Sequence, residues 1–287
     1  MGVLAGIEDA SGFDLRECEY FVGTSAGSIV AAHLVAGDSP RRPSSIGREV
    51  ALADPQPVNG LAGAALGAAR RAGAFALAAS AAFAPLALGL AEPSAALVRA
   101  ALLRRLPPPH STLGELRRRV EQSAARFDGR LRVVAVERRT GRRTIFGSPG
   151  APKATVGQAV EASCTVPWLF APVQIGGRDY VDGGIWSPTN LDAAPAGRDT
   201  QVLCLNPIAS LTATSTAIGV VRGVARTAVS IESLALRRRG ASVTTLAPNA
   251  ECAEAMGTNF MNREPSQRVL AAAYRQGLKA GQYGRPG

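Results

Sequence analysis

One serine in this sequence stands where it could act as a nucleophile. Ser25 is the central residue of Gly23-Thr24-Ser25-Ala26-Gly27, a G-x-S-x-G pattern. The pattern alone is common, but here it follows a short apolar stretch and opens an apolar run. That context predicts a strand, a tight turn and a helix, with the serine exposed on the turn. The alternative is a helix start rich in serine and glycine that carries no chemistry.

The predicted turn would favour a negative charge on the serine oxygen. Ser25 would project from the N-terminus of the helix, where the helix dipole and the free backbone N–H groups stabilise an alkoxide or an oxyanion. We expect Gly23 and Gly27 to be glycines because a Cβ at either position would crowd the turn or the packing of helix on strand.

A serine hydroxyl needs a base, and neither histidine is well placed to be one. His33 lies eight residues after Ser25 on the same predicted helix, roughly 12 Å along its axis and therefore out of reach. We expect its imidazole to be packed or paired with a partner. His110 follows three prolines in a stiff loop and would reach the site only if the neighbouring segment folded over it. A Ser-His-Asp triad is therefore disfavoured.

A carboxylate is the better candidate base. Asp182 follows a predicted strand at 179–181 and precedes Gly183 and Gly184, so its side chain can point into a cleft from a tight turn. Burial there would raise the pKa of the carboxyl group and make it a competent base for a hydroxyl within hydrogen-bond distance. Taken alone, Asp-Gly-Gly is typical of an ordinary turn.

Three motifs, taken in order, resemble those of the patatin-like phospholipase family. They are residues 23–28 (Gly-Thr-Ser-Ala-Gly-Ser), 162–167 (Ala-Ser-Cys-Thr-Val-Pro) and 180–184 (Tyr-Val-Asp-Gly-Gly). The resemblance covers most of the chain outside residues 40–125. It implies a three-layer α/β/α fold and a phospholipase or esterase that hydrolyses phospholipids or other acyl-ester lipids.

The same resemblance implies how the residues would work. Ser25 would be the nucleophile and Asp182 the base of a Ser-Asp dyad that acts through an acyl-enzyme, without histidine, metal or cofactor. Acyl transfer to an alcohol other than water would use the same two residues.

The resemblance also implies a feature that this sequence lacks. Members of the family carry a strand and a glycine-rich loop before the helix that residues 2–7 resemble, and the loop supplies backbone N–H donors to the oxyanion. Here the Ala26 N–H is the one evident donor, and losing a donor typically costs about 2.7–4 kcal/mol of transition-state stabilisation. Two interpretations stay open. Either the true start lies upstream, or this is a shortened relative with little or no turnover that binds lipids or membranes.

The elements that must position these residues alternate between strands and helices, which favours a single α/β domain over residues 1–287. We predict helices at 2–10, 26–36, 155–163 and 265–280. We predict strands at 18–22, 131–136, 143–146, 173–175, 179–181 and 202–205. Gly176-Gly177 indicates a hairpin between two of these strands, and the apolar strand at 202–205 is typical of the interior of a parallel sheet.

Residues 54–112 differ in composition from the rest, because Ala, Leu, Gly and Pro dominate and 72–91 contain no charge. The uncharged run is long enough to cross a bilayer. Against a crossing, Ala and Gly supply little transfer energy and Pro85 interrupts the run. We expect a cap or an interfacial helical insertion, with an ordinary packed helical pair and a membrane span as alternatives.

Composition sets the remaining limits. The net charge of +10 would attract the protein to an anionic surface. The alternative is that biased codon usage explains the many arginines, which are scattered along the sequence.

The four cysteines lack the spacing of metal ligands, which predicts reduced thiols. The arginine triplets at 117–119 and 237–239 are typical of solvated helix faces rather than nucleic-acid contacts. The N-terminus lacks the pattern of a signal peptide, so we expect a cytoplasmic protein with peripheral membrane contact.

Overall fold

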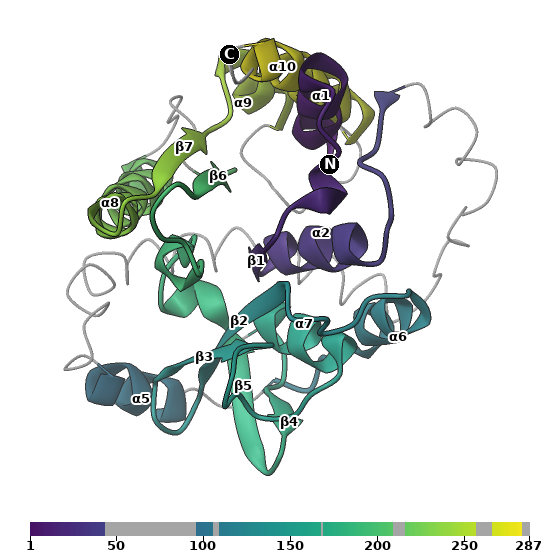
Figure 1. Ribbon diagram of the computed structural model, residues 1–287. Helices are drawn as coiled ribbons and strands as arrows, with labels where there is room; N and C mark the ends of the chain where they lie inside the picture. The colour runs from purple at the N-terminus through teal and green to yellow at the C-terminus, as the bar shows by residue number, and fades with distance from the viewer. Residues whose placement is uncertain (44–95, 106–108, 168, 209–215, 257–265, 283–287) are drawn as a thin grey trace, which may run out of the picture.

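The computed structural model describes residues 1–43, 96–105, 109–167, 169–208, 216–256 and 266–282. A mixed five-stranded sheet lies at its centre (Figure 1). The first strand, β1 (Phe21–Thr24), pairs in parallel with β2 (Leu131–Glu137). Two further strands pair antiparallel with β2, namely β3 (Arg143–Phe146) and β5 (Arg178–Asp182). A hairpin joins β5 to β4 (Val173–Ile175), as the two glycines between them predicted.

Helices cover both faces of this sheet, which confirms the predicted three-layer α/β/α arrangement. One face carries α2 (Ala26–Val35), α6 (Gly114–Gln122) and α7 (Val156–Cys164), whose apolar side chains share a core with Val133 and Ala135 of β2. The other face carries α5 (Ala96–Arg105) and the short helix η4 (Gly183–Ile185), and there Leu103 packs on Val136. Because β2 is buried on both faces, it is the axis around which the site is built.

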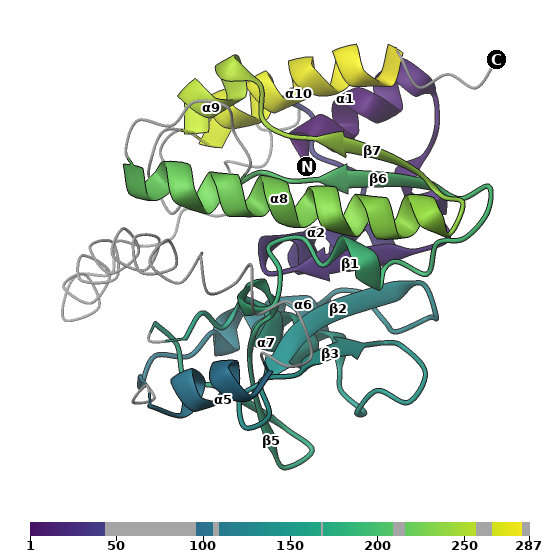
Figure 2. The same ribbon diagram turned by 90° about the vertical axis from the view of Figure 1, so that its left-hand side faces the viewer.

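Two further strands form a separate parallel sheet. These strands, β6 (Gln201–Leu205) and β7 (Ser242–Leu246), run beside α8 (Thr216–Arg238) (Figure 2). Leu236 of α8 is buried against this sheet. The predicted parallel strand at 202–205 is confirmed, but its placement in a sheet interior is wrong. Leu203 is 39% exposed, and in a sheet of two strands β6 is an edge strand.

The first and last helices of the fold lie side by side. Figures 1 and 2 both show α1 (Gly2–Ser11) against α10 (Ser266–Gln282), with α9 (Ala250–Met256) beside them. Their backbones touch through glycines. A Cβ on Gly6 would overlap the Tyr274 carbonyl oxygen, and one on Gly277 would lie 2.9 Å from the Gly6 Cα. No side chain larger than hydrogen fits between the two helices at these positions.

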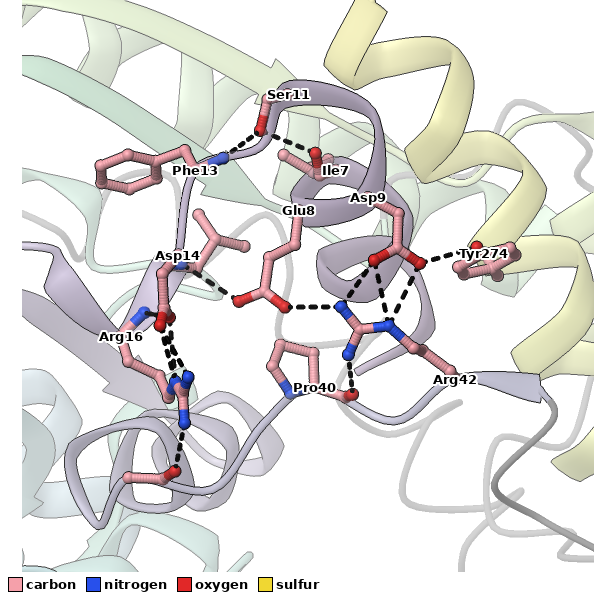
Figure 3. A network of polar contacts seen from close by, with 12 residues as sticks. Ile7, Glu8, Asp9, Ser11, Phe13, Asp14, Arg16, Pro40, Arg42 and Tyr274 are labelled. Atoms are coloured by element: carbon pink, nitrogen blue, oxygen red, sulfur yellow. Dashed lines mark hydrogen bonds and ion pairs between the residues drawn. The ribbon is translucent and has the colours of Figure 1, made fainter.

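A polar network at the edge of α1 reinforces this contact (Figure 3). The Tyr274 hydroxyl donates to the Asp9 carboxylate at 2.7 Å, and the Arg42 guanidinium donates to the same carboxylate at 2.6 Å. Arg42 also reaches Glu8 at 3.3 Å. The two acids of α1 therefore tie it to α10 and to the segment that follows α2.

The first strand begins later in the sequence than predicted. The strand predicted at 18–22 is placed too early, because the Asp14 side chain caps a short helix, η1 (Leu15–Glu17), and pairing with β2 begins only at Phe21.

The insertion predicted at about 54–112 lies mostly outside the described residues, and its described end contains α5, which packs on the sheet. Among the helices described, none has the length and hydropathy that a bilayer crossing needs.

Candidate active site

Ser25 stands on the sharp turn between β1 and α2. Its backbone angles, φ 51° and ψ −126°, are rare for a residue with a side chain and store strain on the order of 1–3 kcal/mol. Gly23 makes the turn possible, since a Cβ there would lie 2.7 Å from the backbone nitrogen of Ser28. The strand, turn and helix predicted around Ser25 are therefore present.

The expected crowding at Gly27 is wrong. Within the described part of the chain, no neighbouring segment comes within 4 Å of a Cβ built on Gly27, and this residue and Ala26 are exposed on the first turn of α2. No described residue therefore crowds the helix N-terminus beside Ser25.

Hydrogen bonds to two buried serine side chains hold the strained turn in place. The Ser25 N–H donates to Ser163 Oγ at 2.9 Å, and the Ser163 hydroxyl donates to the Val134 carbonyl at 2.7 Å. The Ser28 hydroxyl donates to the Ser25 carbonyl at 2.6 Å. Ser163 is fully buried in α7, so it links the turn to α7 and to β2. Both backbone polar groups of Ser25, its N–H and its carbonyl, are thus held by the Ser163 and Ser28 side chains.

Asp182 is the last residue of β5 and is only 5% exposed. Its N–H donates to the Thr165 carbonyl at 2.8 Å, and its carboxylate accepts the Gly184 N–H at 2.7 Å. Gly183 and Gly184 leave room for this turn, since Cβ atoms there would lie 2.9 Å from the Val134 carbonyl carbon and 3.0 Å from Asp182 Oδ1.

The surroundings of Asp182 suit a base. Burial raises the pKa of its carboxyl group to about 6, and hydrogen bonds from the Gly184 N–H and the Ser25 hydroxyl offset part of that rise. A carboxyl group with this pKa is ionised at neutral pH yet accepts a proton more readily than an exposed aspartate does.

The sheet register explains why Ser25 and Asp182 meet. Thr24 of β1 pairs with Val134, and Asp182 of β5 pairs with the next residue, Ala135. Since β3 occupies the other edge of β2 over residues 133–136, β1 and β5 follow each other along a single edge of β2, and their C-terminal ends meet there. The Ser25 hydroxyl is consequently placed against the Asp182 carboxylate.

A cysteine also borders the pair, but its chemistry differs. Cys164 Sγ lies 3.9 Å from Ser28 Oγ and interacts with the Ser25 hydroxyl. Burial and the nearby Asp182 carboxylate raise the pKa of this thiol to about 12. A thiol with that pKa stays protonated at neutral pH, so Cys164 does not compete as a nucleophile. All four cysteines are free, as expected.

Neither histidine joins the site. His33 Nδ1 lies 2.6 Å from the Asp38 carboxylate, which is the kind of partner expected for it. His110 is exposed, and within the described part of the chain no contact joins it to Ser25 or Asp182.

Asn190, which no sequence pattern reveals, touches both halves of the site. Its Nδ2 donates to Thr24 Oγ1 at 3.1 Å, to the Gly183 carbonyl at 3.2 Å and to the Ser187 carbonyl at 2.7 Å. Thr24 directly precedes the candidate nucleophile, and Gly183 directly follows the candidate base. In the sequence Asn190 lies in Pro-Thr-Asn, which is typical of an ordinary loop. Ser163 lies within the second motif, but the motif does not reveal its bond to Ser25.

A comparison with protein families identifies one match. The model of the family described as "Patatin-like phospholipase" matches residues 1–195. That range contains the turn at Ser25, the second motif in α7, the turn after Asp182, and Asn190. The residues beyond it supply β6, β7, α8, α9 and α10. None of the curated proteins compared with the chain matches it.

Proposed function

The chain belongs to the patatin-like phospholipase family, and on that premise we propose that it is a lipid acyl hydrolase with Ser25 as nucleophile and Asp182 as general base. The observation that carries the proposal is the contact between a buried carboxylate with a pKa of about 6 and a serine hydroxyl at the N-terminus of α2. A base of this pKa is matched to work at neutral pH.

The proposed reaction has two halves. Asp182 takes the proton of the Ser25 hydroxyl while the oxygen attacks the ester carbonyl carbon, and the carbonyl oxygen gains the negative charge. The N–H of Ala26, the residue after Ser25 at the N-terminus of α2, would donate a hydrogen bond to that oxyanion. As the tetrahedral intermediate collapses, the ester C–O bond breaks and Asp182 returns the proton to the leaving alcohol. Water, deprotonated by Asp182, then attacks the acyl carbon. The bond from that carbon to the Ser25 oxygen breaks, Asp182 returns the proton to this oxygen, and the carboxylic acid leaves.

A lipid is the substrate class that the family implies. Ala26 and Gly27 are exposed and no described residue crowds Gly27, so we infer that an acyl ester approaches Ser25 over the start of α2. The net charge of +10 favours approach to an anionic lipid surface, where guanidinium groups pair with phosphate. We therefore propose a phospholipid or another acyl-ester lipid as substrate, reached by peripheral contact with a membrane.

A fluorophosphonate probe tests the nucleophile. We expect the probe to phosphonylate Ser25, because it reacts with serine hydroxyls that a neighbouring base activates. Mass spectrometry of the digested protein should place the label on the peptide that contains Ser25. Ser25→Ala should abolish both the label and the hydrolysis of a short-chain p-nitrophenyl ester.

Ser123→Ala is the matched control for this experiment. Ser123 ends α6, where its hydroxyl donates to the Val120 carbonyl, so this variant should be labelled like the parent protein. Labelling of Ser25→Ala at the parent rate would refute the assignment. If the parent protein reacts neither with the probe nor with the ester, the non-enzymatic lipid-binding alternative is favoured instead.

The pH dependence of hydrolysis tests the base. Because only the ionised carboxylate can accept a proton, kcat/KM should stay constant above about pH 6 and fall about tenfold per unit below it. The profile is measured with the short-chain ester, over the pH range in which circular dichroism shows the fold to be intact.

Glu232 provides the control for this profile. It is a second buried acid whose pKa is raised by burial, and its carboxylate contacts the loop at 189–191. Glutamine keeps an oxygen that can accept both bonds from this loop, so Glu232→Gln should keep the bend near pH 6. A flat profile between pH 5 and 8, or a bend that disappears in Glu232→Gln, would show that Asp182 is not the titrating base.

A further inference from the structure

The side chain of Asn190 is rigidly oriented. Asn190 is fully buried, and its Oδ1 lies 3.3 Å from Arg143 Nη1. A guanidinium group only donates, so the atom facing Arg143 must be the amide oxygen. The amide nitrogen must then face the other way, toward Gly183 and Ser187, whose carbonyl oxygens only accept. The donors and acceptors around Asn190 therefore allow a single orientation of its amide.

The loop that carries Asn190 is anchored independently of the site. The Leu191 N–H and the Thr189 hydroxyl both donate to the Glu232 carboxylate of α8, at 2.7 and 2.6 Å. Arg143 is held in turn by a two-point contact with Asp192, at 2.6 and 2.8 Å. These bonds fix the backbone on both sides of Asn190, so its side chain reaches the site from a fixed position.

Asn190 also has a backbone conformation that few residues accept. Its φ is 48° and its ψ 36°, in the left-handed region that asparagine and aspartate tolerate better than other residues with side chains. Aspartate can therefore replace it with the same backbone and nearly the same shape. The change is that the amide NH2 group, which carries both N–H donors, becomes a single oxygen of a negatively charged carboxylate.

We propose that Asn190 is a positioning residue for hydrolysis, because its amide joins the strand end before Ser25 to the turn after Asp182 and thereby sets the contact between the hydroxyl and the carboxylate. The proposal rests on the proposed function for its effect on turnover. Its structural part concerns only how Thr24 and Gly183 are held together. Asn190 touches neither the Ser25 hydroxyl nor the Asp182 carboxylate in any hydrogen bond described, so its influence passes through their backbones.

Asn190→Asp is the principal test. The carboxylate would face the Gly183 and Ser187 carbonyl oxygens, and this repulsion should loosen the turn. A misplacement of about 1 Å can cost about 100-fold in rate, so we expect kcat for the short-chain ester to fall about 10- to 100-fold while KM changes less than about threefold. The bend in the pH profile should also move upward, because the bond from the Ser25 hydroxyl lowers the pKa of Asp182.

Two further variants separate the loss of the Asn190 bond from general effects of the substitution. Thr24→Val removes only the hydroxyl that accepts the Asn190 amide, with no change in size, and should give a smaller loss of the same kind even if Asn190→Asp folds poorly. Asn249→Asp makes the same chemical change at the start of α9, where the side chain accepts the Cys252 N–H. That site lies at the opposite end of the molecule from β5 (Figures 1 and 2), so its kinetics should match those of the parent protein.

Hydrogen exchange decides the proposal without relying on turnover. In Asn190→Asp, peptides that contain the Ser25 and Gly184 amides should exchange at least about tenfold faster, while peptides from α10 remain unchanged. If the parent protein hydrolyses no ester, the proposed function fails but the exchange comparison still stands. Unchanged exchange at both amides, or a parent-like kcat and pH profile in an active protein, would overturn the role of Asn190.

Discussion

Replacing Asp182 with asparagine is expected to lower kcat/KM for ester hydrolysis about 1,000-fold and, at the same time, to raise the free energy of unfolding at pH 8. The loss of activity follows from the loss of the base, since general-base catalysis typically contributes about 100- to 10,000-fold. An amide has nearly the same shape as the carboxylate but cannot accept the Ser25 proton at neutral pH.

The gain in stability follows from the burial of the carboxylate. The pKa of Asp182 is raised from 3.8 in the unfolded chain to about 6 in the fold, so the native state binds the proton more tightly. Its stabilising contribution is therefore fully present below about pH 3.8 and is lost as the pH rises through about 6. At pH 8 the buried charge costs up to about 3 kcal/mol. Because asparagine is itself a buried polar group, we expect it to recover about 1–2 kcal/mol.

Urea unfolding at pH 8 measures this gain. Asp179→Asn on the same strand is the control, because it removes a carboxylate whose side chain is partly exposed and should change neither stability nor activity appreciably. Retained hydrolysis in Asp182→Asn would eliminate Asp182 as base. A lower free energy of unfolding for Asp182→Asn at pH 8 would show that the buried charge of Asp182 does not destabilise the fold.

Gly6→Ala is expected to lower the free energy of unfolding by about 2–4 kcal/mol. The added methyl group would overlap the Tyr274 carbonyl oxygen and lie 2.6 Å from the Leu278 backbone nitrogen. Both obstacles are backbone atoms, so no side chain can turn aside and the two helices must separate. Overpacking of a closed interface typically costs about 1–3 kcal/mol, and more when the backbone has to move.

Gly114→Ala separates this effect from helix propensity. Gly114 begins α6, and the nearest atom to a Cβ built on it, Thr112 Oγ1, is 3.8 Å away. Alanine there should leave the urea midpoint unchanged or raise it slightly, because alanine favours helix more than glycine does. If Gly6→Ala unfolds at the same urea concentration as the parent protein, the backbones of α1 and α10 are not in contact at Gly6.

The parts of the site that were predictable are those encoded by neighbouring residues. The turn at Ser25 depends on Gly23 and on the apolar runs on either side of it, all within a few positions in the sequence. The turn at Asp182 likewise follows from its two glycines and the hairpin before it. Asp182 as candidate base required the family resemblance as well, since Asp-Gly-Gly is more often only a turn.

What could not be predicted depends on contacts between distant residues. Asn190 meets Thr24 across 166 positions, and Ser163 meets Ser25 across 138. No local pattern marks either contact. The expected crowding at Gly27 was wrong for the same reason, because crowding there depends on which segments pack nearby. β7 was missed because its polar and apolar residues form too short a pattern to indicate a strand.

The pairing of α1 with α10 also has a consequence for how the protein is made. The bond from Tyr274 to Asp9 joins residues 265 positions apart, and a ribosome adds roughly 5–20 residues per second. On the order of 10–50 s therefore pass between the synthesis of α1 and that of α10, the helix on which Gly2 and Gly6 of α1 pack. A helix of ten residues is marginal by itself in water. We therefore expect the strands that carry Ser25 and Asp182 to assemble during translation, whereas α1 docks only after α10 has left the ribosome.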